Sequence, residues 1–245
     1  ENNRIREQRV GREQVKQFLP IADARKNKWT MDWATYTPPV LDKIGIQEKI
    51  PFPLEELVPY IDWTPFFSSW ELAGKYPDIL TDAVVGEEAT KLFVEAKAML
   101  RKIVDEKWLE ARAVWGIFPA NQGTEDDIII YADEERTTEK MRLQCLRQQL
   151  KKAPGQPNRS LSDFVAPVGK SDFIGSFAVS AGFNIEKMDA YFLENLDDYQ
   201  SILLKALADR LAEALAEKLH EWVRMNTWAY AKDENHSTVD LLKEN

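Results

Sequence analysis

Residues 197–224, DDYQSILLKALADRLAEALAEKLHEWVR, form the longest periodic stretch of the sequence. Its apolar side chains recur every three or four residues, which is the spacing of one face of a helix. They are Leu203, Leu207, Leu211, Leu215, Leu219 and Trp222. Because a helix in a protein gains most of its stability from packing such a face, we predict a long amphipathic helix that organises the core.

The opposite side of this predicted helix is charged. At about 100° per residue, one stripe collects polar side chains: Asp209, Glu213, Glu217, His220 and Arg224. Charged stripes on long helices usually face water, so periodicity alone favours a solvated surface. The functional alternative is a row of carboxylates that lines a cleft for a cation.

Elsewhere the sequence alternates between helical and strand-like patterns. A second amphipathic helix is predicted from Glu87 to Val104, and a third from Arg136 to Lys151. Strand candidates, rich in β-branched and aromatic residues, span 113–118, 127–131, 164–166 and 173–179. Helices and strands that follow one another without a regular βαβ repeat predict an α+β fold.

The first part of the chain is predicted to be an arm. Residues 1–16 are polar and charged, which is typical of a solvated helix or of a linker. The prolines among residues 38–53 exclude a long helix there. Trp29 and Tyr36 offer apolar area that can anchor extended chain. We therefore expect residues 1–38 to be an N-terminal arm or linker packed on the core.

Composition and charge narrow the class of protein. The 245 residues include 41 acidic and 32 basic side chains, and the net charge of -9 argues against nucleic acid or an anionic membrane as a partner. The single cysteine, Cys145, excludes a disulfide or a thiolate metal cage within the chain. No run of about eighteen apolar residues and no signal peptide is visible. We expect a cytoplasmic protein.

Other familiar chemical sites find little support. Glu217 and His220 have the Glu-x-x-His spacing of di-iron bundles, but such sites need a second pair. The only other histidine, His236, follows Asp233 at that spacing, and a surface ion pair is the simpler interpretation. The chain has no Gly-x-Ser-x-Gly, no dinucleotide-binding glycine motif and no Walker loop. A nucleotide-like ligand would have to bind in another way.

Ordered blocks along nearly the whole chain carry a resemblance to a known family. Two stand out: Tyr60-Ile61-Asp62-Trp63-Thr64-Pro65-Phe66-Phe67 and Lys205-Ala206-Leu207-Ala208-Asp209-Arg210-Leu211-Ala212-Glu213-Ala214. Others are Phe118-Pro119-Ala120-Asn121, Leu161-Ser162-Asp163-Phe164-Val165-Ala166-Pro167 and Asp197-Asp198-Tyr199. On these blocks the chain resembles the C-terminal activation domain of cobalamin-dependent methionine synthase.

The resemblance implies a fold and a role. The family fold is a C-shaped single α+β domain with long helices around a bent antiparallel sheet, here expected over residues 39–245. It binds S-adenosylmethionine and swings over the cobalamin domain when the cofactor is oxidised to cob(II)alamin. Reduced flavodoxin, or a flavoprotein reductase, supplies an electron, and the sulfonium methyl is transferred to cobalt. Cobalamin belongs to a separate domain, and zinc only to the homocysteine domain of the full-length enzyme.

The resemblance also implies ligand-binding residues. Asp62, Glu213 and, more weakly, Glu244 carry over as S-adenosylmethionine ligands, with no catalytic and no metal-binding residue. Carboxylates suit the α-ammonium and sulfonium charges of that molecule. Each has a plain alternative, since Asp62 can cap a helix, Glu213 can be a solvated charge and Glu244 can fray. We interpret His220 as structural or interfacial.

The sequence departs from the family in several places, which include a longer linker at residues 154–158. Family members continue past Glu244 into an Arg-Pro-Ala-Pro-Gly-Tyr segment whose arginine pairs with the ligand carboxylate. We therefore expect the chain alone to be incomplete at its C-terminus, to bind S-adenosylmethionine poorly and to be inactive. Ala229 stands between Trp228 and Tyr230, where the family usually has glycine. The alternative function is a non-catalytic docking or regulatory domain for a corrinoid protein or flavodoxin.

Overall fold

The structure, a computed structural model, describes residues 17–41 and 43–234. Helices and an antiparallel sheet make up the fold, so the predicted α+β class is confirmed. The described residues form two compact units. Unit 1 contains residues 17–38 and 118–174, and unit 2 contains residues 39–41, 43–117 and 175–234. The predicted polar segment 1–16 lies outside the described residues.

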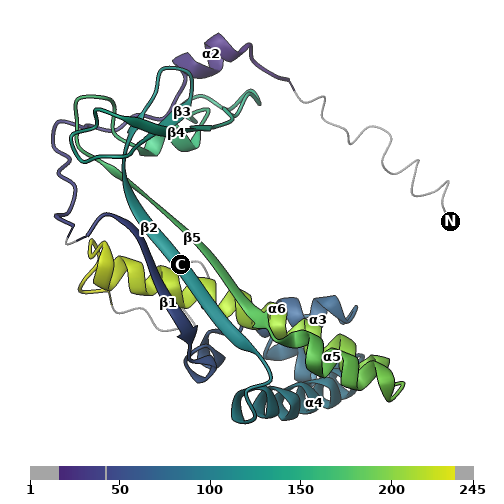
Figure 1. The fold of residues 1–245 in the computed structure, drawn as a ribbon. Coiled ribbons are helices and arrows are strands. Elements are labelled where there is room, and N and C mark those ends of the chain that lie inside the picture. Colours follow the sequence, from purple (N-terminus) through teal and green to yellow (C-terminus); the bar gives the residue numbers. More distant parts are fainter. Residues whose placement is uncertain (1–16, 42, 235–245) are drawn as a thin grey trace. The chain divides into compact units, whose positions relative to one another are not determined.

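Unit 2 holds most of the helices (Figure 1). Their bounds are α3 Trp63–Ser69, α4 Gly86–Asp105, α5 Ile185–Glu194 and α6 Asp198–Trp222, with 3-10 turns η1 Leu54–Glu56, η2 Val58–Tyr60 and η3 Asp78–Thr81. A π-helical stretch, η5, follows α6 over Val223–Thr227. Because α3, α4 and α5 each contact α6, the predicted long helix is confirmed as the element that organises this unit.

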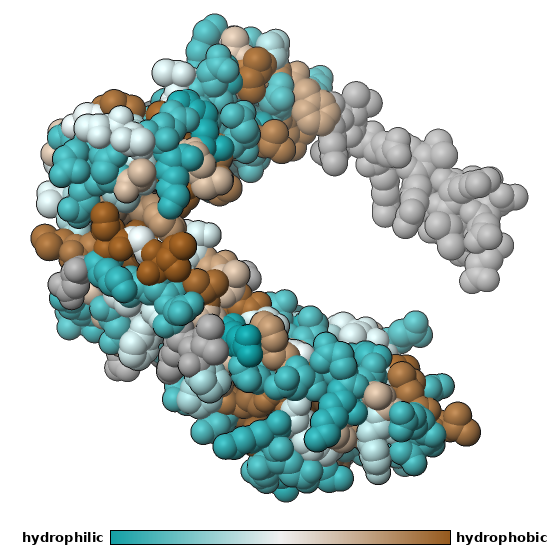
Figure 2. All heavy atoms as spheres, viewed as in Figure 1, coloured by the Kyte–Doolittle hydropathy of each residue, from teal (hydrophilic) through white to brown (hydrophobic). Residues whose placement is uncertain are grey.

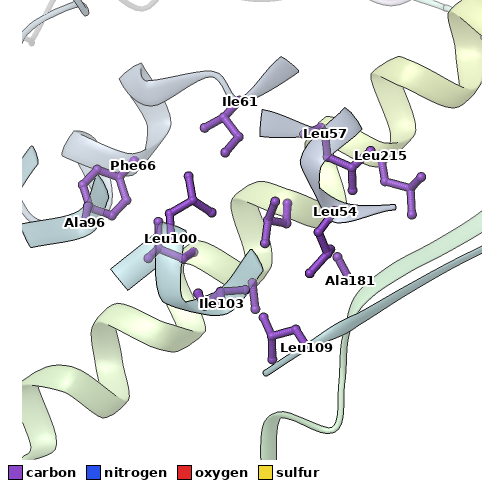
Figure 3. Close-up of a cluster of buried hydrophobic side chains, with 14 of the residues drawn as sticks. Leu54, Leu57, Ile61, Phe66, Ala96, Leu100, Ile103, Leu109, Ala181 and Leu215 are labelled. Carbon is purple, nitrogen blue, oxygen red and sulfur yellow. The ribbon is translucent and has the colours of Figure 1, made fainter. Parts of the chain in front are cut away.

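The core of unit 2 is apolar and is built on α6 (Figure 3). At most 1% of the surface is exposed on each predicted stripe leucine: Leu203, Leu207, Leu211, Leu215 and Leu219. Burying a leucine contributes about 1.5–3 kcal/mol, so this stripe is a main source of stability. Trp222, predicted as the last member of the stripe, is instead 42% exposed.

The strands form one sheet whose longest members belong to both units. β2 (Glu110–Gln122) and β5 (Phe173–Phe183) each continue from one unit into the other, and they pair with each other. In unit 2, β1 (Gly45–Phe52) pairs antiparallel with β2. In unit 1, the end of β2 pairs antiparallel with β3 (Asp127–Tyr131), and β3 with β4 (Glu139–Gln144). The strand candidates 113–118 and 127–131 are confirmed as β2 and β3, although β2 is longer than expected.

Two sequence predictions in unit 1 are wrong. No helix spans residues 136–151, because β4 lies there and pairs along β3. Pairing with a neighbouring strand overrides helical propensity. Cys145, which the sequence analysis placed within that helix, comes directly after β4 instead. Residues 164–166 are not a strand, since a 3-10 turn, η4 (Leu161–Phe164), begins with a capping box formed by Ser160 and Asp163.

Several short elements were not predicted at all. They are α2 (Ile21–Lys26) in unit 1, and β1, α3 and α5 in unit 2. After α2 the chain runs without regular structure, and Trp29 stacks on Phe164 with ring centroids 4.8 Å apart. The Tyr36 hydroxyl donates a hydrogen bond to Asp172 at 2.8 Å.

No helix among the described residues is long and apolar enough to cross a membrane.

Unit 2 also exposes apolar side chains at the end of α5, where Figure 2 shows brown atoms at the lower right. The exposed fractions are 56% for Tyr191, 46% for Leu193 and 91% for Leu196. Leu196, in the link to α6, has a positive φ of 57°, a conformation that side chains rarely adopt. This tip of the unit therefore presents apolar surface to solvent.

Candidate functional site

The charged stripe of α6 contains both paired and unpaired groups. Asp209 pairs with Arg210 at 2.5 Å. Arg224, which the structure places in η5 after the end of α6, donates two hydrogen bonds to Glu234, at 2.8 and 2.6 Å. Glu213 is exposed and forms no hydrogen bond or ion pair with any residue that the structure describes. Its surroundings are those of a solvated face, and the same exposure leaves its carboxylate open to a cation.

Glu217 and His220, the pair with di-iron spacing, do not gather further ligands. The His220 ring meets the Phe177 ring edge-on, with centroids 5.3 Å apart. His220 also lines a cavity of about 110 Å³ together with Trp115 and other aromatic residues. Within residues 17–41 and 43–234, no group of three or more His, Cys, Asp or Glu side chains could hold a metal ion. His236 lies outside those ranges.

Asp62 is the N-cap of α3 and is half-buried. Its Oδ1 accepts a hydrogen bond from the backbone N–H of Thr64 at 2.9 Å, which is the helix cap named as the plain alternative to a ligand role. Its second oxygen has no partner among the described residues. Because each carboxylate oxygen can accept more than one hydrogen bond, the cap leaves Asp62 with capacity for a ligand.

Asp62 and Glu213 lie on elements that pack against each other. η2 and α3, which flank Asp62, both contact α6. Between them Ile61 is 4% exposed and belongs to the same core cluster as Leu215 of α6 (Figure 3). Glu244, the third predicted ligand, lies outside the described residues. The structure thus places two of the three predicted residues on neighbouring elements of unit 2.

A polar cluster next to Asp62 was missed by the sequence analysis. The Tyr60 hydroxyl donates to Glu221 Oε2 at 2.6 Å, and Lys218 Nζ donates to the Tyr60 hydroxyl at 3.0 Å and to Glu221 Oε2 at 2.9 Å. Lys218 Nζ also lies 4.9 Å from the centroid of the Tyr60 ring. We call these residues the Tyr60–Lys218–Glu221 clamp. The sequence showed only the i,i+3 spacing of Lys218 and Glu221, which says nothing about Tyr60.

Burial and hydrogen bonding fix the charges of the clamp. Burial raises the pKa of Tyr60, and its bond to Glu221 raises it further. Burial alone would raise the pKa of Glu221, but bonds from Tyr60 and Lys218 hold that pKa below its usual value. Burial opposes the charge of Lys218, yet its bonds to Tyr60 and Glu221 raise its pKa overall. At neutral pH the clamp therefore contains a neutral phenol, a carboxylate and an ammonium group.

A second ionic cluster is buried in unit 1. The Arg147 side chain is 0% exposed and donates to both oxygens of Asp163 at 2.7 Å and to Asp126 Oδ1 at 2.8 Å. Arg25 of α2 donates to Asp126 Oδ2 at 2.7 Å. The carbonyl of Asn158 accepts a further bond from Arg147, also at 2.7 Å. Because these groups are matched to one another, we interpret the cluster as structural.

The structure thus defines an α+β protein whose unit 2 is built around α6. Two carboxylates, Glu213 on α6 and Asp62 beside it, can still accept hydrogen bonds. The sequence model of a family described as the vitamin B12-dependent methionine synthase, activation domain, matches residues 53–245. The crystal structure of the MetH reactivation domain bound to AdoHcy is similar, with a TM-score of 0.87 and 50% sequence identity. The match covers 93% of this chain and 70% of that chain. The chain belongs to the methionine synthase activation domain family, and the predicted resemblance is confirmed.

Proposed function

We propose that this chain is an S-adenosylmethionine-binding reactivation module that supports the reductive methylation of cob(II)alamin to methylcobalamin. The observation that carries the proposal is the pair Asp62 and Glu213, two carboxylates with free capacity on packed elements of unit 2. The crystal structure with AdoHcy, at 50% identity, supports a ligand of this type. We propose Glu244 as a third ligand from the family motif.

The residues fit a ligand that carries positive charge. S-adenosylmethionine has an α-ammonium and a sulfonium group, and a fixed carboxylate can hold either by a charge-assisted bond or by its field. Glu213 pairs with no described residue, so it can bind the ligand without first breaking a contact within the protein. Asp62 is held in place by its cap bond to Thr64. Both groups are therefore suited to orient the ligand.

The proposed reaction also needs partners. The bound ligand supplies the methyl group, and reduced flavodoxin or a flavoprotein reductase supplies one electron. Cob(II)alamin thus gains one electron and a methyl cation equivalent, which balances methylcobalamin and S-adenosylhomocysteine as products. A separate domain of the same enzyme holds the cobalamin. The part played by this chain is to bind the methyl donor and fix its orientation.

Titration calorimetry with S-adenosylmethionine tests the proposal. The chain is titrated both as residues 1–245 and extended by the Arg-Pro-Ala-Pro-Gly-Tyr segment of the family. A charge-assisted hydrogen bond contributes about 1.5–3 kcal/mol, so Glu213→Gln is expected to weaken binding by roughly 10- to 150-fold. Glu194→Gln, at an exposed position that ends α5, makes the same charge change and is expected to bind normally.

Two outcomes would contradict the proposal. One is equal binding by the parent protein and the Glu213→Gln variant. The other is that neither residues 1–245 nor the extended chain binds S-adenosylmethionine, while flavodoxin or a corrinoid protein still binds. The second outcome would favour the docking or regulatory alternative.

A further inference from the structure

The Tyr60–Lys218–Glu221 clamp joins η2, which ends just before Asp62, to α6, which carries Glu213. Tyr60 ends η2, two residues before Asp62. Lys218 and Glu221 lie on α6, the helix that carries Glu213. From this arrangement we infer that the clamp is a positioning device that sets Asp62 relative to Glu213 for binding of the ligand. This inference rests on the proposed function and adds residues that do not touch the ligand.

Short covalent paths link the clamp to both carboxylates. Successive Cα atoms are 3.8 Å apart, so the Cα of Asp62 lies within about 7.6 Å of that of Tyr60. Ile61 between them is 4% exposed and fixed in the core. On α6, Glu221 is eight positions after Glu213, which is a rise of about 12 Å along one continuous helix. A shift at the clamp is therefore transmitted to the spacing of Asp62 and Glu213.

The bonding pattern of the clamp separates positioning from attachment. Lys218 and Glu221 pair within α6 at 2.9 Å, and this bond does not involve Tyr60. Two bonds cross between elements, and both end on the Tyr60 hydroxyl. Removing that single oxygen breaks both crossing bonds and leaves the pair on α6 intact. The apolar contacts of the surrounding core still attach the segment to α6.

Directional bonds add what apolar packing lacks at this point. The hydrophobic effect is non-directional, whereas the two hydrogen bonds to the Tyr60 hydroxyl require fixed positions of donor and acceptor. Lys218 also lies over the Tyr60 ring, with Nζ 4.9 Å from its centroid. The ring and the hydroxyl are thus held together by one lysine. Apolar contacts hold η2, the turn before Asp62, against α6, and the two hydrogen bonds also fix its position along the axis of α6.

Calorimetry of the Tyr60→Phe variant with S-adenosylmethionine, in the extended chain, tests the inference. We expect affinity to fall by about three- to ten-fold, the size of one ordinary hydrogen bond. The matched control is Tyr199→Phe, which removes a hydroxyl that donates to Glu95 at 2.5 Å between α6 and α4. That variant loses the same chemical group on a crossing bond of α6 and is expected to keep full affinity.

A double-mutant cycle with Asp62→Asn gives a readout that a merely structural role would not change. If the clamp acts through Asp62, Tyr60→Phe costs affinity in the parent protein and costs little once the Asp62 charge is gone. An equal loss in both backgrounds, or no loss in the parent, overturns the inference. If Asp62→Asn loses affinity and Tyr60→Phe does not, the positioning role of the clamp is wrong and the proposed function still holds. Unchanged affinity in Asp62→Asn removes Asp62 from the proposed function and the inference with it.

Discussion

Units 1 and 2 use charged side chains in opposite ways. In unit 1, the fully buried Arg147 is bonded to Asp126 and Asp163, and these groups satisfy one another. In unit 2, Glu213 is exposed and pairs with no described residue, and Asp62 uses one oxygen for its helix cap. The denser cluster is thus the less suitable place for a ligand. The two proposed ligand residues keep unused hydrogen-bonding capacity, and both belong to unit 2.

The largest effect is expected from breaking the cluster of unit 1. Arg147→Met leaves Asp163 buried without its cation, and removing one partner of a buried ion pair costs about 3–5 kcal/mol of unfolding free energy. Urea unfolding measures it. The control is Arg112→Met, because Arg112 is 42% exposed in its pair with Glu110 and an exposed pair contributes at most about 1 kcal/mol. A loss in Arg147→Met as small as that expected for an exposed pair would contradict a stabilising role for the buried cluster.

Low pH should lower the unfolding free energy through the same cluster of Arg147, Asp126 and Asp163. Burial alone would raise the pKa of Asp126, but hydrogen bonds from Arg147 and Arg25 outweigh it and hold that pKa below its usual value. A carboxylate with a lowered folded pKa stabilises the protein above its unfolded pKa, about 3.9, and this stability is lost as pH falls through the folded pKa. We therefore expect unfolding free energy to fall below about pH 4. The fall should be shallower in Arg147→Met, and an identical slope would contradict the assignment.

Asp62 allows the cap and the ligand role to be separated. Asn is as good an N-cap as Asp, whereas Ala loses about 1 kcal/mol of stability. We expect Asp62→Ala to lower the unfolding free energy by about that amount, with Asp62→Asn close to the parent protein. Both should lose affinity for S-adenosylmethionine, because both lack the charge. Normal binding by Asp62→Asn would reduce Asp62 to a cap.

The smallest effect concerns Ala229, which has a positive φ of 59°. An L-residue pays about 1–2 kcal/mol in this conformation, and glycine avoids that cost but loses more chain entropy on folding. Ala229→Gly is therefore expected to be neutral or to stabilise by up to about 1 kcal/mol in thermal unfolding. Ala231→Gly, where no positive φ occurs, should be neutral or destabilising. Destabilisation by Ala229→Gly would contradict the backbone assignment.

The sequence predicted long periodic elements well and short ones poorly. α4 and α6 carry many apolar positions at helical spacing, so their patterns predict them. α2 and α3 have six and seven residues, too few for a period to appear. β4 was predicted as a helix because its exposed, charged residues show no strand alternation, and only the pairing with β3 makes it a strand. Local pattern fails where the deciding contact is distant in the sequence.

The candidate site was predictable in part. Asp62 and Glu213 came from family blocks, and the helical period of α6 placed Glu213 on the charged side. The structure shows the cap made by Asp62 and the exposure of Glu213, which were the plain alternatives, and their role as ligands stays a prediction. The clamp was out of reach, because Tyr60 and Glu221 are 161 residues apart. No spacing rule connects groups at that separation.

The most direct test is a map of backbone amide shifts as S-adenosylmethionine is added to the chain, a measurement that also detects millimolar binding. We predict that the largest shifts fall in unit 2, at residues 60–64 and 209–221. The amides of Asp126, Arg147 and Asp163 in unit 1 should stay unchanged. Shifts centred on that buried cluster, or none in unit 2 at saturating ligand, would contradict the account.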